Sequence, residues 1–395
     1  MSEHGSGKTT RLARVVPRTR WERTLLMGFS ALMGLAMVAL SLLCGGVTFL
    51  DALMTDPLQV AAGAAAAFAL GSPYLLVILW LDRNEPEPPW LVVATLMWGG
   101  LTATGVSIFF NDLFSLFAMA GTQNAELAGM LTRSFSAPVV EEIAKGSALL
   151  VIYLFFRRHF DSVLDGVVYG ALLGLGFAVV ENALYYQRPE SVQEFAQLVL
   201  LRSVLTGAGT HMCFTACTGA AVGAFRVLRS GFWRYLLPPI GLALGIGAHF
   251  AWNTFVGLFV APFEAELAQL FIGIPFAVLF LQVPFMLLVA IVAFLASMHE
   301  NRILVAYLET ESDSVLRDGE LAVLVPSRRR LSYLLSVFVG DGPGAWWRQR
   351  RRFGLLVSLA FEKWHMDREA DDASDDAALH AVRVQGLRRQ LKKTT

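Results

Sequence analysis

Ionisable side chains interrupt four consecutive apolar stretches of the sequence, and six of them are of types that could do chemistry together. These residues are Glu141, Glu142, Lys145, Glu181, His211 and His249. An ionisable group inside a membrane helix is costly, so its presence there indicates a functional site by default. Carboxylates and imidazoles contributed by separate helices can activate water, either directly or through a bound metal. The pattern therefore favours hydrolytic chemistry.

Spacing along each helix limits which groups can meet. Lys145 follows Glu141 by four residues and Glu142 by three, so either carboxylate can reach the ammonium on one helix surface. Adjacent helical residues point about 100° apart, so the two carboxylates cannot share one direction. We expect one to pair with Lys145 while the other faces a cavity. His249 and Asn253, four apart, share one face of their helix.

Two hydrolytic mechanisms fit these residues. In the first, His211, His249 and Glu181 bind zinc, and Glu141 or Glu142 activates the bound water. In the second, no metal is used, and a desolvated glutamate beside a histidine activates water directly. In either case Lys145 tunes the glutamate pair. Asn253 orients a histidine or donates to a developing oxyanion.

Each group also has a purely structural interpretation. Histidines in membrane helices often form interhelical hydrogen bonds, and Glu142 with Lys145 can be a structural ion pair. Asp165 is expected to cap or anchor its helix. Cys213 and Cys217 flank His211, and we expect them to be small buried residues rather than metal ligands. It is the combination of groups that favours a functional site.

The elements that must position these residues are membrane-spanning helices. The 395-residue chain is 55% hydrophobic and only 16% charged, against about 25% charged residues in typical soluble domains. Apolar residues come in blocks long enough to cross a hydrocarbon core. The sequence thus predicts an all-α, polytopic membrane helical bundle of about eight transmembrane helices, at 25–50, 58–81, 90–110, 137–156, 162–186, 199–225, 235–259 and 270–296.

The distribution of Lys and Arg predicts the orientation, because cytoplasmic loops are enriched in them. It divides the chain into a basic cytoplasmic N-terminus at 1–24, a transmembrane domain at 25–296 and a cytoplasmic tail at 297–395. Both termini of this multi-pass cell-membrane protein are then cytoplasmic. With this topology and a rise of about 1.5 Å per residue, the three glutamates and two histidines can meet in the outer half of the bilayer.

The tail is predicted to be helical but not to span. Its apolar segments at 331–339 and 353–361 are too short, so they lie beneath the membrane or pack on each other. Basic clusters at 328–330 and 348–352 either contact anionic lipid or form a solvated surface. The sequence does not identify a partner for the tail.

Taken together, these residues resemble the PrsW family of membrane-embedded proteases, which is similar to the type II CAAX prenyl endopeptidases. The resemblance covers about 75–297. It rests on motifs that follow one another along the chain: Asp82-Arg-Asn-Glu-Pro-Glu-Pro88, Glu141-Glu142-x-x-Lys145, Asp165-Gly166-Val-Val-Tyr169-Gly170, Phe177-x-x-x-Glu181-Asn182, His211 and His249. One departure is Asn253, where several relatives carry an aspartate; an amide can orient or donate but cannot act as a base.

The resemblance implies hydrolysis of a peptide bond in a membrane-bound protein, within or beside the bilayer. It implies a single-span substrate, such as the anti-sigma factor that family members cut on its outer side. It also implies a zinc-dependent mechanism, although related enzymes have been described as metal-independent glutamate proteases.

Two other functions use the same residues. Intramembrane Glu and His also serve proton-coupled transporters and channels, but the two halves of the sequence show no inverted repeat of the kind such transporters carry. The second alternative is a non-catalytic scaffold that uses these polar groups only for helix packing. Nothing in the sequence predicts a nucleic-acid partner.

Overall fold

The computed structural model describes residues 20–206, 209–228, 231–370 and 376–393, and every regular element among them is a helix. The predicted all-α polytopic membrane fold is confirmed, whereas positions 1–19 of the predicted N-terminal segment lie outside the described residues. The α-helices are α1 (Arg20–Thr55), α2 (Pro57–Leu81), α3 (Pro89–Met97), α4 (Thr104–Thr122), α5 (Ala125–Leu131), α6 (Ala137–Phe155), α7 (Val163–Tyr185), α8 (Val192–Val199), α9 (Gly209–Val227), α10 (Phe232–Val260), α11 (Glu266–Ala268), α12 (Ile274–Ala277), α13 (Val283–Leu308), α14 (Glu320–Leu324), α15 (Ser327–Ala370) and α16 (Asp376–Lys392).

Helical stretches that are long and apolar enough to cross a membrane number five among the described residues. They are Pro57–Leu81, Pro89–Thr122, Val163–Tyr185, Phe232–Val260 and Glu266–Leu308, and each overlaps a predicted span. The predicted spans 25–50 and 137–156 fall on α1 and α6. The predicted span 199–225 is not one continuous helix, because π-helical turns at 200–205 precede α9. The total of eight crossings therefore stays a prediction.

The bundle is organised around α7, whose residues 164–178 are all buried. Helix α9 packs against α7 at unusually close range, and glycines make this approach feasible. A Cβ on Gly166 would lie 2.1 Å from the carbonyl oxygen of Gly219, and one on Gly174 would lie 2.2 Å from that of His211. Small residues let membrane helices approach this closely. The glycines thereby fix where His211 sits along α7.

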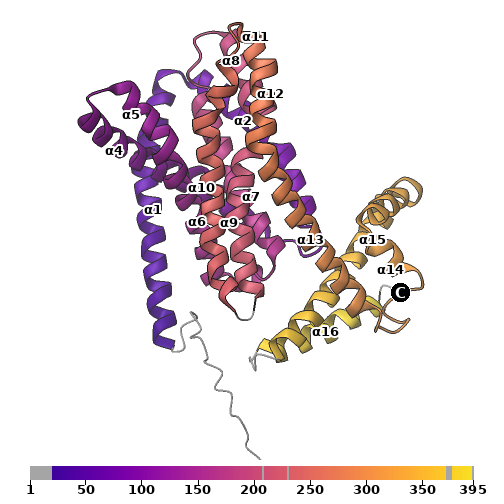
Figure 1. The fold of residues 1–395 in the computed structure, drawn as a ribbon. Coiled ribbons are helices and arrows are strands. Elements are labelled where there is room, and N and C mark those ends of the chain that lie inside the picture. Colours follow the sequence, from indigo (N-terminus) through magenta and orange to yellow (C-terminus); the bar gives the residue numbers. More distant parts are fainter. Residues whose placement is uncertain (1–19, 207–208, 229–230, 371–375, 394–395) are drawn as a thin grey trace, which may run out of the picture.

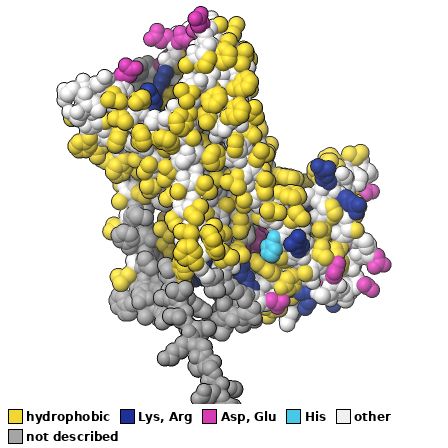
Figure 2. Space-filling model, viewed as in Figure 1, with side chains coloured by type: hydrophobic (Ala, Val, Ile, Leu, Met, Phe, Trp, Pro, Cys, Tyr) yellow, Lys and Arg dark blue, Asp and Glu magenta, His cyan; other side chains and the backbone are white. Residues whose placement is uncertain are grey.

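The outside of the bundle is apolar. Figure 2 shows hydrophobic side chains covering the flank of the bundle, while charged side chains gather at its upper end and over the C-terminal helices. Large apolar side chains are exposed on several helices, including Phe68, Trp80, Leu258 and Phe294. A continuous apolar exterior is what a lipid-facing surface requires, because lipid replaces water as the solvent there.

The N-terminus of α7 is held by a capping box. The Ser162 hydroxyl accepts a hydrogen bond from the Asp165 backbone N–H, and the Asp165 carboxylate accepts from the Ser162 N–H in return. The same carboxylate also accepts from the Asp161 backbone N–H at 2.8 Å. The prediction that Asp165 caps its helix is thus confirmed.

The C-terminal helices form a second core beside one end of the bundle (Figure 1). Helix α13 connects the two parts and continues to Leu308, so the boundary predicted at 297 lies inside a helix. The predicted apolar segment 353–361 packs in this second core, whereas 331–339 is mostly exposed. Within this core, Arg352 and Glu320 form a buried bidentate ion pair with N–O distances of 2.6 and 2.7 Å.

Candidate active site

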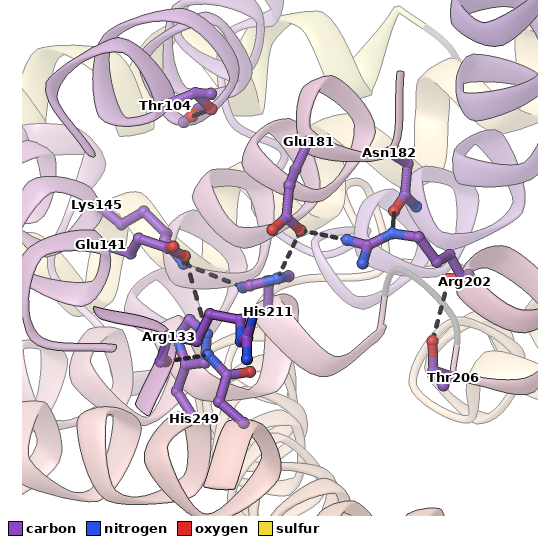
Figure 3. Close-up of polar contacts among 12 residues, drawn as sticks. Thr104, Arg133, Glu141, Lys145, Glu181, Asn182, Arg202, Thr206, His211 and His249 are labelled. Carbon is purple, nitrogen blue, oxygen red and sulfur yellow. Dashed lines mark hydrogen bonds and ion pairs between the residues drawn. The ribbon is translucent and has the colours of Figure 1, made fainter. Parts of the chain in front are cut away.

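Four helices bring the six predicted groups to one place. Glu141, Glu142 and Lys145 come from the beginning of α6, and the others from the end of α7, the beginning of α9 and the middle of α10. Figure 3 shows five of these side chains pointing toward one another from separate helices: Glu141, Lys145, Glu181, His211 and His249. Four of the six groups, together with Asn253, line a cavity of about 330 Å³; they are Glu141, Glu181, His211 and His249.

The paired glutamates take different environments, as their 100° offset predicts. Glu142 and Lys145 are fully buried and form an ion pair of 2.7 Å. The other oxygen of Glu142 accepts a hydrogen bond of 2.8 Å from the Thr215 hydroxyl on α9. Glu142 does not line the cavity, whereas Glu141 does. Glu142 therefore ties α6 to its neighbours, and Glu141 is the carboxylate presented to a ligand.

Glu141 has an unused acceptor. Its Oε2 atom is buried and has no hydrogen-bond partner among the described residues. It lies 3.7 Å from Nζ of Lys145 and 3.9 Å from Nε2 of His249. A buried carboxylate oxygen without a hydrogen bond is costly, so this atom is available to a metal ion or a reacting water.

His249 is oriented by Glu142, the ion-pair partner of Lys145. Its Nδ1 atom lies 3.2 Å from Oε1 of Glu142, and donation of an N–H to that carboxylate leaves a lone pair on Nε2, the atom that faces Glu141. A histidine that donates one ring N–H to a carboxylate and presents the other nitrogen is the usual arrangement of a metal-binding imidazole.

His211 is held between opposite charges. Nδ1 lies 3.2 Å from the Lys145 ammonium, which can only donate, so this nitrogen is the acceptor. Nε2 lies 3.1 Å from Oε2 of Glu181 and so carries the proton of a neutral imidazole. Coordination of a metal by His211 requires that one of these two hydrogen bonds be released.

Arg202 is a site residue that sequence reasoning missed. Its guanidinium donates to Glu181 at 2.7 Å and to the Asn182 side chain at 2.8 Å, and it stacks over the Tyr185 ring at 3.7 Å. The signal was present, because Arg202 is itself a charged residue inside a predicted span. It fixes the Glu181 carboxylate at the wall of the cavity.

At this cavity, the group of side chains that could hold a metal ion differs from the predicted one. One ligand atom each from Glu141, His211 and His249 lie within 4.8 Å of one another. The predicted ligand Glu181 is outside this group and is paired with Arg202 instead. Asn253 lines the cavity, but its amide donates 2.9 Å to the Arg133 carbonyl oxygen. No hydrogen bond from it to either histidine is seen within the described part of the chain.

The chain is similar to proteins of one known family. The model of the PrsW family of intramembrane metalloproteases matches residues 87–308. Protease PrsW of Geobacillus kaustophilus is 29% identical over 213 residues, which cover 51% of this chain and 85% of the relative. Protease PrsW of Bacillus subtilis is 31% identical over 126 residues, 32% of this chain and 52% of the relative. None of the solved structures matches the chain.

Proposed function

Because the chain belongs to the PrsW family of intramembrane metalloproteases, we propose that its peptidase centre is the group formed by Glu141, His211 and His249. One observation carries this proposal: the buried Oε2 of Glu141 has no hydrogen-bond partner among the described residues and lies beside His249. The chain is a multi-pass membrane peptidase, which favours this function over a transporter or a scaffold.

The residues present suit a zinc ion, the metal we propose. Two imidazoles and one carboxylate form a ligand set typical of catalytic zinc, which leaves a position open for water. Two atoms have lone pairs that such an ion would bind: the Oε2 atom of Glu141, which has no hydrogen-bond partner among the described residues, and the Nε2 atom of His249, which faces it. When bound, zinc lowers the pKa of a water molecule and polarises a carbonyl group.

The protein's other groups then act as follows. Glu142 keeps His249 in the tautomer that presents Nε2, and Lys145 compensates the buried charge of Glu142. Glu181 is the remaining carboxylate on the cavity wall and would be the group that receives a proton from a reacting water, while Arg202 and His211 hold its Oε2 atom in place. This exchanges the sequence-based roles of Glu141 and Glu181. Asn253 supplies an amide donor at the rim of the cavity.

We also propose a single-span membrane protein as the substrate, with an anti-sigma factor as the specific candidate. The cavity lies where α6 and α9 begin and α7 ends. With both termini in the cytoplasm, this end of the bundle is the outer half of the bilayer. A site at that depth suits cleavage of a transmembrane segment near its outer end.

The test is cleavage of a single-span reporter by purified protein in liposomes, together with zinc analysis. We expect Glu141→Gln and His249→Ala to abolish cleavage and to lower the bound zinc by about one ion per chain relative to the unaltered protein. Glu126→Gln, an exposed acid on α5, is the matched control and retains both. Full cleavage by both site variants would refute the assignment of the centre. Loss of cleavage from a protein that never contained zinc would refute the metal and leave a glutamate mechanism.

A further inference from the structure

A second group of metal-type ligands lies away from the cavity, where the C-terminal helices meet the bundle. It consists of Glu85 in the loop after α2, Asp161 in the loop before α7, and His365 on α15. These residues are far apart in the sequence and come from three separate segments. The active centre proposed above uses none of them.

The imidazole of His365 sits between the two carboxylates. Its Nε2 atom lies 3.2 Å from Oε1 of Glu85 and 3.4 Å from Oδ2 of Asp161. One N–H can donate well to only one carboxylate oxygen at a time. One ligand atom from each of the three residues falls within 4.8 Å of the others, which is close enough for all three to bind one ion.

Asp161 gives an independent sign of a missing ligand. Only 9% of its side chain is exposed, and its Oδ1 atom has no hydrogen-bond partner among the described residues. A buried carboxylate oxygen normally has a partner. Its backbone groups, by contrast, are occupied: the N–H donates to Asp165 and the carbonyl accepts from Arg368.

The surrounding charge also suits a cation. Asp82 and Glu87, both buried, come from the same loop as Glu85. Local cations are partly engaged elsewhere, since Arg368 donates to the backbone carbonyls of Asp161 and Arg226. Buried carboxylates are stable when they are paired or bound to a metal. The Glu85 side chain is 40% exposed, which provides an ion with a path from solvent.

We propose that Glu85, Asp161 and His365 bind a divalent cation of the zinc class and thereby fasten α15 to the two loops of the membrane domain. Two carboxylates and one imidazole suit a borderline metal such as Zn²⁺ better than Ca²⁺ or Mg²⁺, which prefer oxygen ligands alone. The same seam carries direct contacts, with Arg330 donating to Asn84 at 2.7 Å and Arg83 donating to Ser327 at 2.8 Å. The ion would stabilise the contact between α15 and the membrane domain, which these hydrogen bonds already hold in register.

The experiment uses the full chain with His211→Ala and His249→Ala, so that the active centre cannot contribute zinc. The detergent-purified protein is stripped with a chelator, titrated with Zn²⁺ and analysed for bound metal. Hydrogen exchange of α15 amides is measured in parallel. We expect about one zinc per chain, with slower exchange of α15 when zinc is present.

Two further variants in that background test the ligands. Asp161→Asn and the conservative His365→Gln should each remove the bound zinc and the slowed exchange. His159→Ala is the matched control, because this neighbouring histidine faces Glu87 at 3.7 Å and lies outside the group; it should leave both unchanged. The proposal is overturned if the background protein binds no zinc or if both ligand variants still bind it. It is also overturned if zinc leaves the hydrogen exchange of the α15 amides unchanged.

Discussion

Gly174→Ala is predicted to disable the site without touching any of its polar groups. A Cβ at position 174 would lie 2.2 Å from the backbone oxygen of His211, and 3.4 Å is the lower end of ordinary contact. Helix α9 would have to retreat from α7 by about 1.2 Å to relieve this overlap, since interiors are close-packed and cannot absorb it. The contact involves backbone, so no side-chain rotation offers a cheaper escape.

The displacement has a calculable effect on catalysis. His211 and Glu181 lie on the two helices that separate, and their hydrogen bond of 3.1 Å would lengthen beyond 3.5 Å, where it ceases to hold. A misplacement of about 1 Å in a catalytic group costs roughly 100-fold in rate. Overpacking of this kind also costs about 1–3 kcal/mol of stability. We therefore expect kcat/KM to fall roughly 100-fold in a protein that still folds.

The assay is reporter cleavage in liposomes combined with thermal unfolding in detergent. Gly247→Ala is the control, because it makes the same substitution two residues from His249 where nothing lies within 4 Å of the added Cβ. That variant should keep wild-type cleavage. If Gly174→Ala cleaves within about twofold of the wild type, the α7–α9 approach does not set the active geometry and the reasoning fails.

Two more predictions follow from named contacts. Arg202→Lys should lower cleavage by about tenfold, the effect of losing one hydrogen bond to a charged group, because an ammonium cannot bridge Glu181 and Asn182 as the guanidinium does. Arg188→Lys alters an arginine over the same Tyr185 ring and should leave cleavage unchanged. Burial raises the pKa of Asp82, in the loop outside the spans, to about 7 from an ordinary 3.8. The folded state then binds its proton more tightly than the unfolded state, so this residue makes stability fall as pH rises from about 4 to 7; Asp82→Asn should flatten that slope in thermal unfolding, and an unchanged slope would contradict the assignment.

Features that depend on neighbours along one helix were predictable. The ion pair of Lys145 with one glutamate, and the exposure of the other to a cavity, follow from spacings of three and four residues. The cap formed by Asp165 follows from its place near a helix start. The membrane class followed from apolar blocks, since only hydrophobic length is needed to identify a span.

Roles that depend on which helix lies opposite were not predictable. The sequence predicted Glu181 as a metal ligand, and its ion pair with Arg202, 21 residues later, was not foreseen. Glu85 and His365 are separated by 280 residues and meet only because the C-terminal helices fold back on the bundle. Nothing in either local sequence encodes that encounter.

The sequence by itself determined that costly acids and imidazoles sit in adjacent membrane helices, because burial in lipid is a property of each segment. Tertiary structure alone decided the partner of each group. A helix's periodicity selects the face on which a side chain lies, whereas the neighbour across that face depends on how closely two helices approach. At α7 and α9 that approach is set by glycines, whose missing side chains bring His211 to Glu181.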